Sequence, residues 1–197
     1  AGLRAVPGMH VFRPCDANEV VECWRIVMQL THHPSVVALT RQNLPTLDRS
    51  RFAPAAGVAF GGYTLSEAEG GAPEVILVGS GSEVHLCLAA QEILAKESIR
   101  ARVVSMPCAE LFDAQDEKYR GSVLPTTVRA RVTVEAASTS GWHRYAGLDG
   151  ETVGMTGFGA SAPAKDLAVH FGFTPERVAE AARRSLSRVR ALAGGAR

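Results

Sequence analysis

Arg41 is the residue of this chain whose type and position best suit a chemical role. It stands in the run TRQNLP at 40–45, directly after the apolar segment 35–39, which we expect to form a buried strand. Ligands of open α/β sheets bind beyond the carboxyl ends of the strands, and a guanidinium there can hold a phosphate through two parallel hydrogen bonds. An arginine at a strand end also serves as a structural ion-pair or capping partner, so both roles stay open at this point.

Two further groups of residues could carry chemistry, and each also has a simpler structural explanation. The turn GSGS at 79–82 joins an expected strand to an expected helix, whose free amides and dipole favour a phosphate. It matches neither the GxGxxG fingerprint nor the P-loop, and a tight turn with a good helix cap explains it. Glu135 and His143 could form an acid/base pair, or they could be a helix-start anion and a surface imidazole.

The cysteines and the paired histidines do not predict a metal site. The four cysteines at 15, 23, 87 and 108 form no CxxC pair, and no histidine stands at zinc-ligand spacing from them. We expect Cys23 and Cys87 to be reduced core thiols of a cytoplasmic protein, and Cys15 and Cys108 to be more exposed in loops. The pair at 32–33 is interpreted as a polar helix end.

Composition excludes several classes of partner. Hydrophobic residues make up 46% and charged residues 21% of the 197 residues, with a formal net charge of +1. This balance gives no electrostatic argument for nucleic acid or a membrane surface, and no run approaches the roughly 20 apolar residues that span a bilayer. The arginine group at 183–190 is interpreted as a solvated face of an amphipathic helix. Because the chain lacks an initial methionine, we expect a fragment.

The first part of the chain predicts a strand–helix–strand unit. A strand at 10–13 is followed by a helix from the N-cap Asp16 to about residue 30, and then by the strand at 35–39. Glu19, three residues after Asp16, completes a capping-box pattern. An apolar stripe at helical spacing predicts the buried face of this helix. Its members are Val20, Trp24, Val27 and Met28.

The rest of the chain predicts a second α/β unit after a linker. We expect residues 1–50 to be a piece of one domain, 51–62 a linker, and 63–197 a second domain with a mostly parallel sheet covered by helices. A second capping-box pattern stands at 80–83. Expected strands lie at 74–79, 102–106, 131–135 and 152–155. Expected helices lie at 82–97, 141–146, from Pro163 onward, and from Pro175 to about 193.

Several phrases of the sequence resemble transketolase, and together they cover essentially the whole chain. RPCDANE at 13–19 and ALTRQNLP at 38–45 are similar to the later part of its pyrimidine-binding domain. The remaining phrases resemble its C-terminal domain, in order. They are GGY at 61–63, GSGSEV at 79–84, ARVVSMP at 101–107, FD at 112–113, YR at 119–120, SVLP at 122–125, VE at 134–135, FGASAPA at 158–164 and FGFT at 171–174.

The resemblance implies a three-layer C-terminal domain preceded by part of a thiamine-diphosphate-binding (pyrimidine) domain. It implies transfer of a two-carbon ketol unit between phosphorylated sugars by a cytoplasmic homodimer, with thiamine diphosphate and Mg²⁺ or Ca²⁺. Arg41 matches the arginine that grips the sugar phosphate. Catalytic, cofactor-binding and metal-binding residues of the family match none in this chain and belong to segments before residue 1, so we expect the isolated chain to be inactive.

Other interpretations stay open beside this one. The chain could be a non-catalytic module that supports dimer assembly. It could also belong to a related thiamine enzyme, such as deoxyxylulose-phosphate synthase or a 2-oxo acid dehydrogenase β subunit, although neither is expected to contain the RQNLP phrase. We expect residues from about 58 onward to fold alone, and the N-terminal piece to be partly disordered or to pack in a non-native way.

Overall fold

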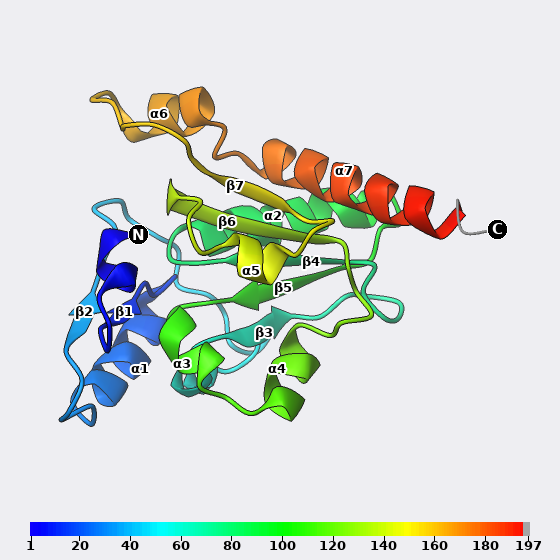
Figure 1. Cartoon of the computed structure of the whole chain (residues 1–197). Helices are drawn as coiled ribbons and strands as arrows, with labels where there is room; N and C mark the ends of the chain where they lie inside the picture. The colour runs from blue at the N-terminus through cyan, green and yellow to red at the C-terminus, as the bar shows by residue number, and fades with distance from the viewer. Residues whose placement is uncertain (195–197) are drawn as a thin grey trace.

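The computed structural model describes residues 1–194, which form two sheets with helices around them. A short 3₁₀ helix, η1 (Gly2–Ala5), precedes a two-stranded parallel sheet of β1 (His10–Phe12) and β2 (Ser35–Val37). Helix α1 (Ala17–Val27) connects these two strands. Figure 1 shows this N-terminal part, in blue, beside the larger second part of the chain. The predicted strand–helix–strand unit is therefore confirmed.

The second part contains a five-stranded sheet with the order β3-β5-β4-β6-β7. Four strands run parallel, and β3 pairs antiparallel with β5 at one edge. The bounds are β3 Tyr63–Ser66, β4 Val75–Gly79, β5 Ala101–Ser105, β6 Arg131–Ser138 and β7 Glu151–Met155. The mostly parallel sheet and its four parallel strands were predicted. The short edge strand β3 was missed.

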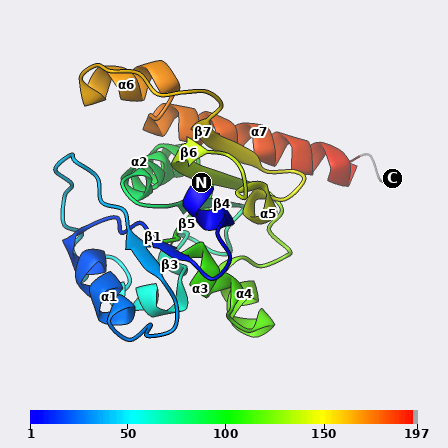
Figure 2. The same cartoon turned by 60° about the vertical axis from the view of Figure 1, so that its left-hand side comes forward.

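Helices cover both faces of this sheet and give the domain three layers. Helices α2 (Glu83–Lys96) and α7 (Pro175–Gly194) lie on one face. Helices α3 (Ala109–Asp113), α4 (Glu117–Val123) and α5 (His143–Ala146) lie on the other, as Figures 1 and 2 show. Helix α6 (Ala164–Phe171) projects beyond the edge strand β7 and buries no residue.

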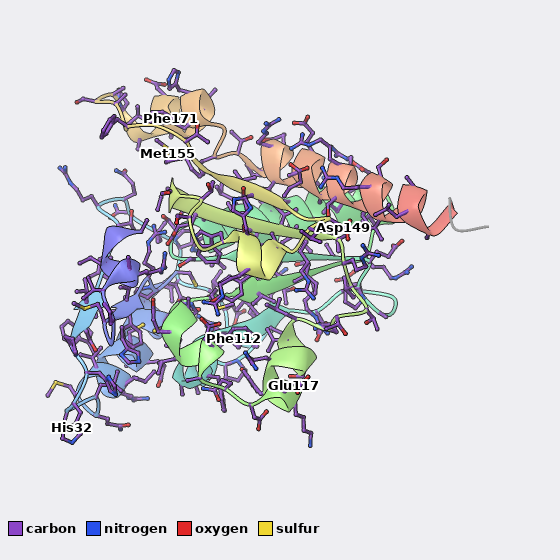
Figure 3. The ribbon with its side chains drawn as sticks, in the orientation of Figure 1. His32, Phe112, Glu117, Asp149, Met155 and Phe171 are labelled. Carbon is purple, nitrogen blue, oxygen red and sulfur yellow. The ribbon has the colours of Figure 1, made fainter. Side chains whose placement is uncertain are left out.

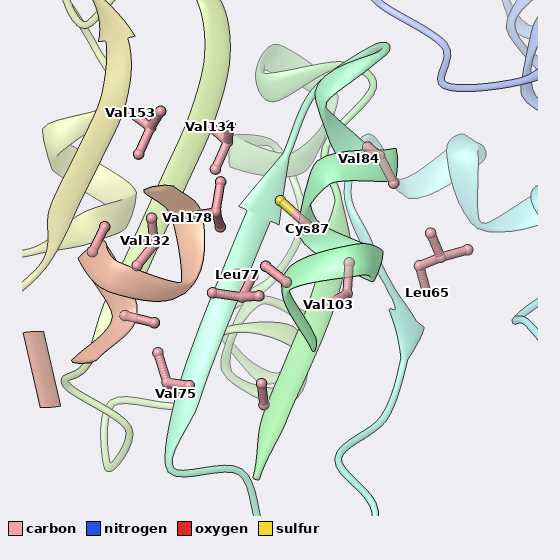
Figure 4. Packing of buried hydrophobic residues seen from close by; sticks show 14 of the residues in the cluster. Leu65, Val75, Leu77, Val84, Cys87, Val103, Val132, Val134, Val153 and Val178 are labelled. Atoms are coloured by element: carbon pink, nitrogen blue, oxygen red, sulfur yellow. The ribbon is translucent and has the colours of Figure 1, made fainter. Parts of the chain in front are cut away.

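The core consists of two apolar clusters, one on each face of the sheet. All five residues of β4 are buried, as a strand covered on both faces requires. Leu77 packs with Cys87 of α2 and Val178 of α7 in the larger cluster, which Figure 4 shows from close by. Ile76, which points the other way, packs in the second cluster with Phe112, labelled on α3 in Figure 3.

Helix α1 begins as predicted, but its buried face and its end differ from the prediction. Asp16 accepts a hydrogen bond from the backbone N–H of Glu19 (2.8 Å), which confirms the N-cap. The helix ends at Val27 rather than near residue 30. The predicted apolar stripe is wrong in part: Val20 and Val27 are half-buried and Val27 packs against the larger core cluster, but Trp24 and Met28 are 50% and 76% exposed. Glu19 and Cys23 are buried in their place. The cause is the contact that α1 makes: it packs on η2 (Ala55–Phe60) with the Glu19/Cys23 face.

Strand β2 is half-buried rather than buried, because within the described residues it pairs only with β1. The segment 51–62, expected to be a linker, contains η2, and the carbonyl of its Ala53 accepts a hydrogen bond from Arg49 (2.9 Å).

The N-terminal segment is docked against the second sheet, contrary to the expectation of disorder or non-native packing. Glu19 is fully buried and accepts hydrogen bonds from the hydroxyls of Tyr63 (2.7 Å) on β3 and Ser105 (2.6 Å) on β5. A buried carboxylate is tolerated only where its oxygens find donors, so these two bonds fix α1 onto the sheet.

Candidate functional site

Arg41 lies in an exposed loop that follows β2, four residues after the last paired strand residue, Val37. Its guanidinium takes part in none of the side-chain hydrogen bonds or ion pairs found among residues 1–194. The structural alternative for this residue, a fixed ion pair, therefore finds no partner in the described part of the chain. A guanidinium without an internal carboxylate keeps its five donors available for an anion.

The loop that carries Arg41 is held at both ends. At its start, the N–H of Ala38 donates to the carbonyl of Phe12 (2.8 Å), which extends the β1–β2 pairing by one bond. At its end, the N–H of Leu47 donates to Oδ2 of Asp16 (3.0 Å). Between these anchors the N–H of Gln42 donates to Oγ1 of Thr40 (3.2 Å). The loop thus places Arg41 beyond the carboxyl end of a parallel strand, where ligands of α/β sheets bind.

The second sheet has its own point of this kind, where the strand order reverses, and an arginine of the chain occupies it. Strands β5 and β6 lie on opposite sides of β4, so the strand order reverses beside the carboxyl ends of β4 and β6. Arg13 enters there and pairs with Glu83 (3.1 Å) and Glu135 (2.8 Å). A Cβ on Gly81 would lie 3.1 Å from the Arg13 guanidinium carbon. The turn at 79–82 is therefore closed by a side chain, and the phosphate interpretation of it gains no support.

The predicted capping box at 80–83 is wrong. Ser82 is the N-cap of α2 and makes no capping bond with its side chain, and its hydroxyl donates to Glu83 Oε1 (2.6 Å). Glu83 Oε2 accepts from the backbone N–H of Ala136 (3.0 Å) and pairs with Arg13, so tertiary partners replace the local ones.

Glu135 is the centre of a buried ion-pair cluster and does not form a pair with His143. Both of its oxygens accept from Arg4 (2.7 and 2.6 Å), one accepts from Arg13, and the other accepts from the Trp142 indole N–H (2.6 Å). Burial raises the pKa of Glu135, but the two guanidiniums and the indole outweigh burial and hold this pKa below its ordinary value.

His143 is exposed and contributes nothing to this cluster. The acid/base interpretation is wrong, and so is the simpler one of Glu135 as a helix-start anion. Trp142 and Tyr145 pack in the second core cluster, and each also makes a hydrogen bond: Trp142 donates to Glu135 (2.6 Å) and Tyr145 donates to Asp113 (3.0 Å).

All four cysteines are buried, so the expectation of exposure for Cys15 and Cys108 is wrong. Burial raises the pKa of Cys108 to about 12 and raises that of Cys15 further. Such thiols are poor nucleophiles at neutral pH.

The ring of His33 meets that of His10 edge to face at 5.0 Å, and no group of three metal-ligating side chains occurs among residues 1–194.

The arginines of α7 form ion pairs with acids of neighbouring elements. Arg183 pairs with Glu97, and Arg184 and Arg188 both pair with Glu151. Arg190 pairs with Glu74. These side chains are solvent-accessible, as the interpretation of a solvated face expects, but they are already paired and offer no free basic patch. No helix of the described chain has the length and apolar composition that crossing a membrane requires.

These features define a class: a C-terminal three-layer α/β domain joined to the end of a second α/β domain that carries a free arginine at a strand end. A family model described as the transketolase-like C-terminal domain matches residues 61–174, and one described as the transketolase pyrimidine-binding domain matches residues 1–46. The chain belongs to the transketolase family.

Individual transketolases are also similar to the chain. The chain is 45% identical over 177 residues to a transketolase of Aquifex aeolicus, covering 90% of this chain and 26% of the relative. It is 48% identical over 192 residues to one of Mycobacterium bovis, covering 94% and 27%. A solved transketolase from Leishmania mexicana superposes with a TM-score of 0.87 at 41% identity, covering 95% of this chain and 26% of that one. The chain thus spans about a quarter of the length of the relatives it matches.

Within residues 1–194 no group of three metal-ligating side chains occurs, and Arg13 closes the turn at 79–82, the one best suited to a diphosphate.

Proposed function

We propose that this chain is the C-terminal part of a transketolase that transfers a two-carbon ketol unit between phosphorylated sugars. Thiamine diphosphate and Mg²⁺ or Ca²⁺ are bound by other segments of that enzyme. The family membership of both matched regions supports this proposal. A transketolase of Pichia stipitis, 39% identical with a TM-score of 0.86, has been solved in complex with sedoheptulose 7-phosphate, which supports a sugar phosphate as the substrate class.

Within this enzyme, Arg41 binds the phosphate of the sugar substrate. The observation that carries this assignment is a guanidinium with no internal partner among the described residues, on a tethered loop beyond a strand end. Its role is positioning: a charge-assisted bond to the distant phosphate fixes the sugar and aligns the reacting carbonyl. Such a contact is made in the ground state and the transition state alike, so it acts mainly on KM.

The test is Arg41→Ala in the full-length enzyme, with Arg51→Ala as the matched control. Arg51 is exposed in the same part of the chain and lies 5.7 Å from the Phe52 ring centre. Loss of a hydrogen bond to a charged group costs about 1.5–3 kcal/mol. We therefore expect kcat/KM for fructose 6-phosphate to fall at least about tenfold, mostly through KM.

For Arg41→Ala, kcat/KM with unphosphorylated fructose should stay near the wild-type value. For Arg51→Ala, kcat/KM and KM should stay near wild type with both sugars. An unchanged KM for the phosphorylated sugar in Arg41→Ala would refute the assignment.

A second role, support of subunit assembly, is favoured by one feature. Phe158 and Val169, which flank and belong to α6, are 99% and 72% exposed. Large apolar side chains exposed on a projecting segment occur on surfaces that a partner covers. We propose that the enzyme is a cytoplasmic homodimer in which this projecting segment contributes to a contact. The double variant Phe158→Ser/Val169→Ser should then weaken the full-length dimer in sedimentation equilibrium, and unchanged dissociation would exclude the segment.

A further inference from the structure

The carboxylate of Asp16 makes more contacts than a helix cap requires. One oxygen, Oδ1, accepts from the N–H of Glu19 and so completes the N-cap of α1. The second oxygen, Oδ2, accepts from the N–H of Leu47 (3.0 Å), and both oxygens accept from Nη2 of Arg49 (2.9 Å each). The side chain is fully buried. Leu47 and Arg49 belong to the segment that closes the Arg41 loop, so Asp16 joins that loop to the helix.

Further contacts near Asp16 hold the C-terminal end of the Arg41 loop. Asn18 on the first turn of α1 donates to the carbonyl of Leu47 (3.2 Å), so both backbone groups of this residue are held. Arg49 in turn donates to the carbonyl of Ala53 (2.9 Å) and to the hydroxyl of Tyr63 (3.0 Å) on the second sheet. Leu47 also packs against the larger core cluster.

The loop itself has few contacts of its own. Arg41, Gln42 and Asn43 are exposed, and the one side-chain hydrogen bond within the loop is the local Thr40–Gln42 bond. The position of the Arg41 guanidinium is therefore determined by the two anchored ends rather than by packing along the loop. At the first end the anchor is a strand pairing, and at the second it is Asp16.

We propose that Asp16 is a positioning residue for the sugar phosphate: its carboxylate, with Arg49, fixes the end of the loop that carries Arg41. This inference rests on the proposed function of Arg41. Loss of the charge leaves the helix cap available, because asparagine also caps helices, but it removes the ion pair in which both carboxylate oxygens accept from Nη2 of Arg49. The loop end then relaxes, and the guanidinium no longer meets the phosphate at its fixed distance.

The experiment uses the full-length enzyme with Asp16→Asn, and Asp116→Asn as the matched control. Asp116 caps α4 by accepting from the N–H of Tyr119 (2.7 Å), and its side chain ties no loop. We expect Asp16→Asn to raise KM for fructose 6-phosphate about tenfold with kcat within about twofold, and to leave kcat/KM for unphosphorylated fructose unchanged. Asp116→Asn should behave as wild type.

A double-variant cycle separates positioning from a general structural role. If Asp16 acts through Arg41, then Asp16→Asn adds little to KM in an Arg41→Ala background. A full additive effect, an equal loss with both sugars, or an unchanged KM in the single variant would each overturn the proposal. If Asp16→Asn does not fold, Arg49→Lys, which keeps the charge but loses the planar fork, is judged by the same criteria.

The outcome also distinguishes the two proposals from each other. A raised KM in Arg41→Ala with a normal KM in Asp16→Asn removes the positioning role and keeps the phosphate contact. A normal KM in Arg41→Ala removes the phosphate contact itself.

Discussion

At the scale of single residues, Glu135 connects the N-terminal segment to the second domain through charge. Its side chain is almost completely buried, while its partners Arg4 and Arg13 are 16% and 19% exposed. Removing a charge from water costs several kcal/mol, which only close partners offset. Here two guanidiniums and an indole N–H meet one carboxylate, so the carboxylate is well satisfied. Two buried donor nitrogens of Arg4, Nε and Nη2, make no hydrogen bond with the described residues, although Nε lies 4.0 Å from Glu110 Oε1, so the cluster is not fully satisfied.

Glu135→Gln should therefore destabilise the chain by about 3 kcal/mol at neutral pH, because the partly buried Arg4 loses its close anion and Arg13 keeps only Glu83. The pKa of Glu135 is depressed in the folded state. The stabilisation is thus complete above the unfolded-state pKa of about 4.3 and is lost as pH falls through the folded value. Urea unfolding at a series of pH values should show the difference between wild type and variant shrinking below about pH 4.

Glu180→Gln is the control for this measurement. Glu180 pairs with Arg177 and Arg184 on the solvent-exposed side of α7, where ion pairs contribute little. We expect no measurable change in the urea midpoint at any pH. A Glu135→Gln difference that persisted unchanged at low pH would contradict the charge-based account.

Local residue patterns could be predicted from the sequence, and distant partners could not. The N-cap at Asp16 follows from a spacing of three residues and was correct. Glu135 was singled out because it ends a strand, but its partners Arg4 and Arg13 lie 131 and 122 residues away in the sequence. No spacing rule joins residues so far apart, because only the docking of the two parts brings them together. The role of Arg41 stays a prediction.

At the scale of elements, the contact between β4 and α2 depends on the absence of a side chain at Gly79. A Cβ there would lie 2.8 Å from the Cα of Val84 and 3.1 Å from the sulfur of Cys87. Real Cβ atoms do not approach backbone so closely, so the helix would have to move away from the strand. This close approach explains why the strand-to-helix turn begins with glycine without any ligand.

Gly79→Ala should accordingly destabilise the chain by about 1–3 kcal/mol through overpacking. Gly121→Ala is the matched control, since Gly121 lies inside α4 and nothing comes within 4 Å of its added Cβ. Alanine there should stabilise by about 0.4–1 kcal/mol, because it reduces the freedom of the unfolded chain. Chemical denaturation of both variants tests whether their free energies of unfolding change in opposite directions. A Gly79→Ala protein as stable as wild type would disprove the close contact.

Patterns within elements failed where tertiary contacts replaced local ones. Trp24 and Met28 have helical spacing, yet α1 packs with Glu19 and Cys23. Glu19 Oε2 accepts from the local N–H of Cys15, but both donors to Oε1 lie on β3 and β5. Sequence periodicity treats a glutamate as a solvent residue and so assigns this face to water. The same kind of replacement occurs at Glu83. The sequence pattern predicts a local capping bond, but its carboxylate pairs with Arg13 and accepts from the N–H of Ala136.

At the scale of the whole molecule, the alternation of strands and helices was sufficient to predict a mostly parallel α/β fold. Strands and helices alternate along the second part of the chain, as they do in parallel sheets, and β4 has the continuous apolar pattern of a strand buried on both faces. Strand β3 was not predicted because it is a short antiparallel edge strand of four residues. The docking of the N-terminal segment could not be predicted, because it depends on single hydrogen bonds between distant residues.

Because of that docking, we expect the isolated chain to unfold as one cooperative unit rather than as two. Its two tryptophans report on the two parts: Trp24 lies in α1 and Trp142 lies against the second sheet. In Trp142→Phe the fluorescence of Trp24, and in Trp24→Phe the fluorescence of Trp142, should follow the same urea transition as far-UV circular dichroism of that variant. Comparing the two probes within each variant removes the destabilisation caused by losing the Trp142–Glu135 bond. A Trp24 signal that changes at lower urea than the dichroism would mean that the Glu19 and Glu135 contacts do not hold the N-terminal segment to the domain.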